Sequence, residues 1–136
     1  MFNLTKEEFR AKWIEALKSG RFKKGKDRLC TIENNDIIRH CCLGVACEIF
    51  KENGGELESK EFLEDFYEYR AYNGIKHYLP NIVREALGLY AEDGLINDNP
   101  HYSLAYVNDH VDSFIPIIEL LENPPKGLYK EESDAT

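Results

Sequence analysis

Cysteine and histidine are the residue types in this sequence best suited to binding a metal. A structural zinc site needs four ligands, usually arranged as two close pairs such as Cys-x2-Cys. The sequence has no such pair of pairs, because Cys41 and Cys42 are adjacent and Cys47 stands alone beyond them. We therefore predict no metal site. The candidate ligands that we considered are Cys30, His40, Cys41, Cys42, Cys47 and His77.

A thiol nucleophile is the second chemistry that these residues allow. Cys41 and Cys42 lie at the start of an expected helix, where the helix dipole lowers the pKa of a thiol. His40 is a poor base for Cys41, because neighbouring residues of a strand point to opposite faces. We predict no catalytic residue and interpret the cysteines as reduced thiols, with Cys42 and Cys47 behaving as small buried hydrophobic residues.

Carboxylates are abundant but form no recognisable catalytic pair. Asp93 and Asp98 lack the spacing of a calcium-binding loop. Asn108-Asp109, ahead of Ser113, is best explained by hydrogen bonds of a turn and helix entry, because such side chains bond readily to nearby backbone. We keep Asn108 and Asp109 as candidate functional residues in a turn.

The basic stretch from Lys18 to Arg28 is the one part of the sequence suited to an anion. Lysines near a helix N-terminus would form a workable anion pocket, and a solvated basic loop is the alternative. No Walker-type loop or GxGxxG fingerprint accompanies the stretch. The candidate ligand-binding residues are Arg21, Lys23, Lys24, Lys26 and Arg28.

Composition limits the class of protein. The 136 residues fit one domain, and the net charge is -8. Residues 1–40 carry ten Lys/Arg and six Asp/Glu, whereas residues 41–136 carry seven and nineteen. An acidic body argues against general nucleic-acid binding, which requires many cations to neutralise phosphates. No apolar run is long enough for a membrane span and no secretory signal is visible, so we expect a cytoplasmic protein without a cofactor.

The first helix has the clearest pattern among the elements that must position these residues. Thr5 and Glu8 form a capping box, and Phe9 and Trp13 share one helical face. Gly20 follows where a left-handed residue ends many helices. The pattern predicts a helix over residues 6–19.

The middle of the chain predicts a hairpin and a second helix. β-branched residues at 29–32 and 37–40 flank an Asn/Asp-rich turn, which is typical of a β-hairpin. Residues 42–50 have a helical apolar face, and Gly44 within it indicates that another element packs closely there. Residues 56–78 are ambiguous, because their aromatic residues fit either a helix or strands.

The remaining elements are short. Leu79-Pro80 opens a helix that Gly88 ends, and Ser113 is a plausible N-cap for a last helix that stops at Asn123. We therefore expect an α+β fold that is mainly α, with about four helices around one core and a small β-hairpin. Residues 1–125 form a single globular domain in this interpretation, and residues 126–136 form a flexible acidic tail.

The order of these motifs resembles a family of small, functionally uncharacterised proteins of tailed bacteriophages and prophages. The resemblance covers about residues 10–122, and Cys-Cys-Leu-Gly-Val is its most specific block. One departure is His110-Val111-Asp112, where the family pattern has a glycine soon after Asn-Asp. The matching residues are Trp13, Ser19-Gly20, Gly25, Cys41 to Val45, Leu79-Pro80, Gly88-Leu89, Asn108-Asp109 and Ser113-Phe114 to Glu119.

The resemblance implies a phage origin and action in the cytoplasm of the bacterial host, and it carries over no catalytic residue. We therefore expect an accessory protein that binds a host macromolecule, most simply a host protein, through its acidic face. Binding of a small anionic ligand such as a nucleotide by the basic loop is the first alternative. A small enzyme that uses a cysteine or carboxylates is the second.

Overall fold

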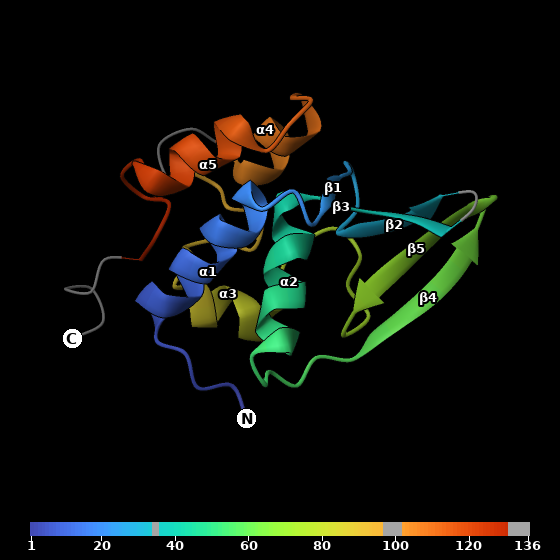
Figure 1. Cartoon of the computed structure of the whole chain (residues 1–136), viewed down its shortest axis with the longest axis horizontal. Helices are drawn as coiled ribbons and strands as arrows, with labels where there is room; N and C mark the ends of the chain where they lie inside the picture. Colours follow the sequence, from blue (N-terminus) through green and yellow to red (C-terminus); the bar gives the residue numbers. More distant parts are fainter. Residues whose placement is uncertain (34–35, 97–101, 131–136) are drawn as a thin grey trace.

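Helices and a sheet form two sides of the molecule (Figure 1). A computed structural model describes residues 1–33, 36–96 and 102–130. Within these ranges it contains five helices, which gather on one side, and a sheet that extends away from them. The helices are α1 (Lys6–Lys18), α2 (Cys42–Glu52), α3 (Asn81–Leu87), α4 (Leu104–Asp109) and α5 (Ile115–Glu122).

The sheet is mixed and has five strands in the order β1-β3-β2-β5-β4 among the described residues. β1 pairs with β3 in parallel, and every other pair is antiparallel. The β4–β5 hairpin reaches furthest from the helices (Figure 1). The strands are β1 (Lys23–Lys24), β2 (Cys30–Glu33), β3 (Ile37–His40), β4 (Ser59–Glu64) and β5 (Tyr67–Tyr72).

The expectation of a mainly helical fold with only a small hairpin is therefore wrong. The predicted β2–β3 hairpin exists, but the ambiguous segment adds β4 and β5 beside it. Every residue of β4 after Ser59 is exposed, so the strand lacks the alternation of apolar and polar residues that marks a half-buried strand. Phe62, Phe66 and Tyr69 also follow helical spacing, so the sequence did not decide between a helix and strands for this segment.

Helix α1 is anchored on the start of α2. Its capping box forms as predicted, with Glu8 N–H donating to the Thr5 hydroxyl. Trp13 is fully buried and its indole N–H donates to the carbonyl of Cys42 over 2.8 Å. Gly44 confirms the predicted close packing, because a Cβ there would lie 1.8 Å from the carbonyl oxygen of Leu29. The β2 entry and helix α2 therefore touch through backbone.

The end of the described chain returns to the helices. Leu128 is fully buried, and Tyr129 forms a β-bridge with Leu89 after α3. Lys130 N–H also donates to the carbonyl of Gly88. Residues 126–130, which we expected in the tail, thus pack on the domain, and the rest of the expected tail lies outside the described residues.

A partly buried charge network joins α2 to the sheet. The Glu48 carboxylate accepts hydrogen bonds from Arg70, at 3.1 Å, and from the Tyr72 hydroxyl. The His40 Nε2 atom lies 3.6 Å from the same oxygen. Burial alone would raise the pKa of Glu48, but its contacts with His40 and Tyr72 outweigh burial and hold the pKa at about 2. The ionised carboxylate therefore holds β3 and β5 against the helix.

This network predicts acid sensitivity. Because the pKa of Glu48 is lowered on folding, its contribution to stability is present above its ordinary value of 4.5 and is lost as the pH falls towards about 2. Denaturant unfolding should lose about 2 kcal/mol across that interval, after a discount for solvent screening. Glu48→Gln should lose clearly less over the same interval. Glu52→Gln, at an exposed position of the same helix, should behave as the parent does. Equal acid sensitivity of all three proteins would contradict this role for Glu48.

Candidate functional site

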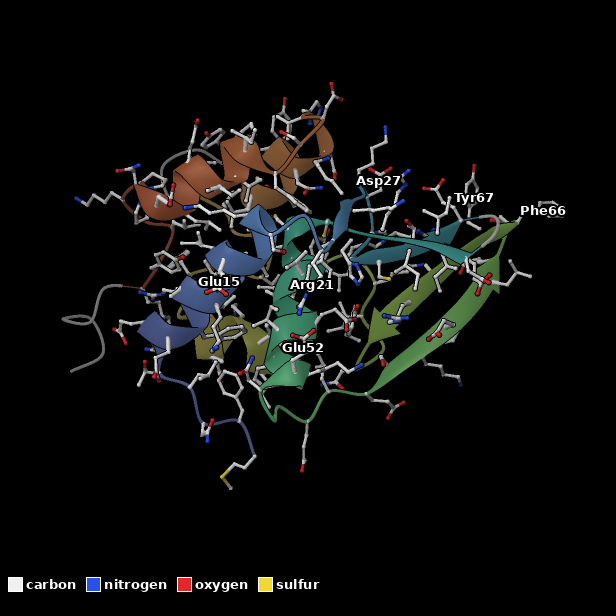
Figure 2. The ribbon with its side chains drawn as sticks, in the orientation of Figure 1. Glu15, Arg21, Asp27, Glu52, Phe66 and Tyr67 are labelled. Carbon is white, nitrogen blue, oxygen red and sulfur yellow. The ribbon has the colours of Figure 1, made fainter. Side chains whose placement is uncertain are left out.

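An open groove of about 840 Å³ lies where the basic loop meets the sheet. Several segments far apart in the sequence form it: the end of β1 and the loop before β2, the strands β2, β3 and β5, His77, and the end of α4 with the residues after it. Figure 2 places Asp27 of the loop on the same side of the molecule as Tyr67 of β5. The lining residues are Lys24 to Arg28, Thr31, Glu33, Arg39, Tyr67, His77 and Asp109 to Asp112.

The structure divides the five predicted anion ligands. Lys24, Lys26 and Arg28 line the groove. Arg21 instead points towards Glu52 of α2 (Figure 2), and its guanidinium lies 2.9 Å from that carboxylate. Lys23 is exposed and does not line the groove. The candidate site thus keeps three of the five residues.

The groove is balanced in charge rather than cationic. Arg39 joins the three basic residues, but four carboxylates line the same space: Asp27, Glu33, Asp109 and Asp112. Glu33 is already paired with Arg39. These carboxylates come from β2, from the loop, from the end of α4 and from the residues after it, so sequence spacing gave no sign that they would face the basic residues. The groove therefore offers both charges to a ligand.

Arg28 has unused hydrogen-bonding capacity at the groove. Its guanidinium stacks over the Tyr69 ring at 4.4 Å, and the Nη1 atom is buried without a hydrogen-bond partner in the described structure. A buried guanidinium nitrogen without an acceptor is unfavourable. Burial also lowers the pKa of the nearby Lys24 ammonium. Both groups would be stabilised by an acceptor placed in the groove.

The helix N-terminus expected to help bind an anion is already occupied. Cys42 N–H, at the start of α2, donates over 3.0 Å to the side-chain oxygen of Asn108. Asn108 is fully buried, and its amide nitrogen donates over 2.9 Å to the carbonyl of Gly25. Asn108-Asp109 is thus the last turn of α4 rather than the loop turn that we predicted. Its role is to hold the basic loop against α2.

Asp109 shapes the loop further. Its carboxylate accepts a hydrogen bond from the backbone N–H of Asp27 over 2.9 Å. The His77 Nδ1 atom lies 2.6 Å from the carbonyl oxygen of Asp27. Asp27 has φ +69°, a left-handed conformation that few residues other than glycine, asparagine and aspartate adopt readily. The two candidate residues Asn108 and Asp109 therefore position the groove.

The tip of the β4–β5 hairpin adjoins the groove and was not singled out by the sequence. Leu63, Phe66 and Tyr67, here called the hairpin tip, are 75%, 100% and 70% exposed. They line a second hollow with Arg28, Thr31 and Glu33, which also line the groove. Figure 2 shows Phe66 at the far end of the hairpin, pointing away from the molecule. The apolar tip and the charged groove form one continuous surface.

The turn at the hairpin tip has an unusual residue. Asp65 and Phe66 both have positive φ, at 51° and 69°, as in a type I′ turn, whose second position is typically glycine. The chain contains a matching turn at Asn73-Gly74, with φ 51° and 79°. Phe66 therefore occupies the position that glycine takes in the second turn. A bulky residue there is strained by about 1–2 kcal/mol.

The cysteines lack the exposure and the lowered pKa that are typical of a reactive thiol. All four are free thiols and buried. Burial raises the pKa of Cys30 and Cys41 to about 11 and that of Cys42 and Cys47 well above the ordinary value. The lowered thiol pKa expected from the helix dipole is therefore wrong, because desolvation of the thiolate outweighs it. The described ranges also contain no cluster of three potential metal ligands and no helix able to cross a membrane.

The position of Asn108 predicts a structural effect. Asn108→Ala removes both hydrogen bonds; it leaves the Cys42 N–H without a partner and the Gly25 carbonyl with only the 3.4 Å hydrogen bond from Lys24. The change should lower the free energy of unfolding by about 2–4 kcal/mol. Asp109→Asn retains an acceptor for Asp27 and should lower it by less than about 1 kcal/mol. Urea unfolding monitored by circular dichroism measures both. Similar stability of Asn108→Ala and the parent would contradict this role.

Comparison with known proteins gives a family but no activity. No curated protein and no solved structure matches the chain. The model of a domain of unknown function, DUF8296, matches residues 5–124. The family description mentions neither a phage nor a ligand, so the origin implied by the resemblance stays a prediction. On the extent of this match, the chain belongs to the DUF8296 family.

Proposed function

We propose that this protein binds another protein through the hairpin tip and the adjoining groove. The observation that carries the proposal is Phe66, a fully exposed aromatic side chain held at a positive φ. Glycine or asparagine would form the same turn with less strain and would expose no apolar surface. An aromatic residue in such a position is explained by a role outside the monomer.

The energetics of the tip favour a protein partner. Burying a phenylalanine side chain contributes about 1.5–3 kcal/mol, which exceeds the strain of the turn. Leu63 and Tyr67 extend the apolar surface on either side. A few aromatic anchors surrounded by polar residues are the usual arrangement of a protein interface. The groove supplies that polar surround on one side.

The charges around the tip specify the partner further. Acidic residues outnumber basic ones in the hollow at the anchors, and residues 41–136 are acidic as well. A partner with an apolar pocket and a rim of Lys or Arg would complement this surface. Three acidic residues line the second hollow: Glu33, Asp36 and Glu68. Two more, Glu64 and Asp65, lie between Leu63 and Phe66 in the sequence. Together with the phage resemblance, this supports an accessory protein that acts on a host protein in the bacterial cytoplasm.

A substitution at Phe66 separates binding from folding. Phe66→Gly should raise the free energy of unfolding by about 0.5–1 kcal/mol, because it relieves the positive φ. The same change should reduce recovery of the partner from bacterial lysate at least tenfold, measured by affinity purification with quantitative mass spectrometry.

Two controls make this test specific. Phe66→Asn also accepts a positive φ and should lose the partner equally. Tyr90→Ala removes an exposed aromatic residue in the segment after α3, outside the tip and the groove, and should retain the partner. A partner recovered equally by the parent and by Phe66→Gly would refute the role of the hairpin tip.

Anion binding in the groove is the second candidate function. The buried Arg28 Nη1 atom without a partner and the partly desolvated Lys24 support it. The four carboxylates oppose it, so the ligand would need donors as well as an anionic group, as a nucleotide has. This candidate uses Lys24, Lys26 and Arg28 and excludes Arg21 and Lys23.

Adjacent lysines provide a matched test of the second candidate. Lys24→Glu should abolish nucleotide binding in isothermal titration calorimetry with ATP and GTP, because Lys24 lines the groove. Lys23→Glu makes the same charge change on the same strand and should leave binding unchanged. Equal binding by both variants, or no binding by the parent, would reject the groove as a nucleotide site.

A further inference from the structure

The outer edge of β4 is the longest unpaired strand edge in the described structure. β4 stands last in the strand order, and its other edge pairs with β5 over six residue pairs. Figure 1 shows no element beside the outer edge. All its residues after Ser59 are exposed. An edge of this kind presents free backbone donors and acceptors that can pair with another strand.

The register of the hairpin defines which β4 side chains share a face. Phe62 is opposite Tyr69, and Glu64 is opposite Tyr67. Because side chains alternate along a strand, Lys60, Phe62 and Glu64 lie on one face of β4. The Lys60 ammonium lies 5.4 Å from the Phe62 ring centre. A positive and a negative residue thus stand at equal distances on either side of a central aromatic residue.

We propose that two copies of this chain associate by antiparallel pairing of their β4 edges, with the two-fold axis at Phe62. This register places Lys60 of each copy opposite Glu64 of the other and the two Phe62 rings side by side. Opposite charges and aromatic pairs directly across two strands are stabilising. The pairing joins the two sheets into one continuous sheet of ten described strands.

Other registers are less favourable, which makes the proposal specific. Residues paired across antiparallel strands lie on the same face, so the neighbouring registers differ by two residues. A shift of two residues in one direction brings Glu61 opposite Asp65 of the second copy and Phe62 opposite Glu64, so that like charges meet and the aromatic pair is lost. A shift of two residues in the other direction brings the two Glu61 side chains opposite one another and removes both Lys60–Glu64 pairs. Charges on an edge strand usually prevent such pairing. Here their arrangement favours one self-complementary register over its neighbours.

The dimer can be tested separately from the proposed function. It depends on the backbone edge and on Lys60, Phe62 and Glu64, of which only Glu64 is also one of the acidic residues near the hairpin tip, whereas the anchor of partner binding is Phe66 at the turn. Phe66→Gly should therefore leave the dimer unchanged, so that failure of one proposal does not imply failure of the other. The interface is short, and we expect a weak dimer that is further weakened by salt.

Reciprocal charge reversal tests the pairing by sedimentation velocity over a range of protein concentrations at low salt. Lys60→Glu and Glu64→Lys should each raise the dimer dissociation constant at least about tenfold, because each places like charges opposite one another at both ends. An equimolar mixture of the two variants should restore association, because each mixed pair again joins a lysine to a glutamate. Fluorescent labelling of one variant identifies the mixed dimer.

The controls exclude a change in the fold. Lys23→Glu reverses an exposed charge on β1, the other edge strand, and should leave the dimer unchanged. Glu64 also lies 3.7 Å from Lys76, so the melting curve of Glu64→Lys is compared with that of the parent. A parent that stays monomeric at every concentration, or single variants that dimerise as the parent does, would overturn the proposal. A mixture that stays monomeric while both variants are folded would overturn it as well.

Discussion

The buried side chain of Asn108 is the interaction on which the arrangement of the groove depends. Its amide joins three segments that are distant in the sequence: the end of α4, the start of α2 and the basic loop at Gly25. Both bonds lie out of contact with water, where an unpaired backbone group is costly. These bonds therefore hold in place the loop that runs from Lys24, at the end of β1, to Arg28.

The start of α2 is fixed from its other sides by equally specific contacts. Trp13 of α1 donates to the carbonyl of Cys42, and the backbone at Leu29 packs directly on Gly44. Further along the helix, Glu48 binds β5 through Arg70 and Tyr72. Helix α2 thus connects the helical side to the sheet. The β4–β5 hairpin extends from this contact with α2, and its exposed residues lie at the far end of the hairpin.

The surface that results has a clear division of roles. The buried Asn108 and the partly buried Glu48 position the elements, and the exposed hairpin tip has no packing partner among the described residues. The groove beside it carries equal numbers of Lys/Arg and Asp/Glu, so its charge does not select a simple anion. An apolar tip next to a mixed polar groove favours a protein partner. Burial of the four thiols gives no support to an enzyme that uses a cysteine.

Local sequence determined the elements whose signals are local. The capping box at Thr5, the helix that ends at left-handed Gly88 and the turn at Asn73-Gly74 all follow from the preferences of a few adjacent residues. The close contact at Gly44 was predictable too, because a glycine inside a helix indicates an approaching backbone. β4 and β5 were not predictable. The exposed β4 lacks the alternation of apolar and polar residues that marks a strand, and Phe66 occupies the turn position where glycine would have indicated a hairpin.

The candidate site was decided almost entirely by tertiary structure. The sequence identified a basic stretch and the Asn108-Asp109 pair, but it could not show that Asn108 and Asp109 hold the basic loop in place. It also could not show that Arg21 turns to Glu52 while four carboxylates face the remaining lysines. The physical reason is that charge and hydrogen-bonding potential belong to single residues, whereas their pairing depends on chain segments brought together by packing. Sequence alone therefore determined which groups are present, and only the fold decided which of them meet.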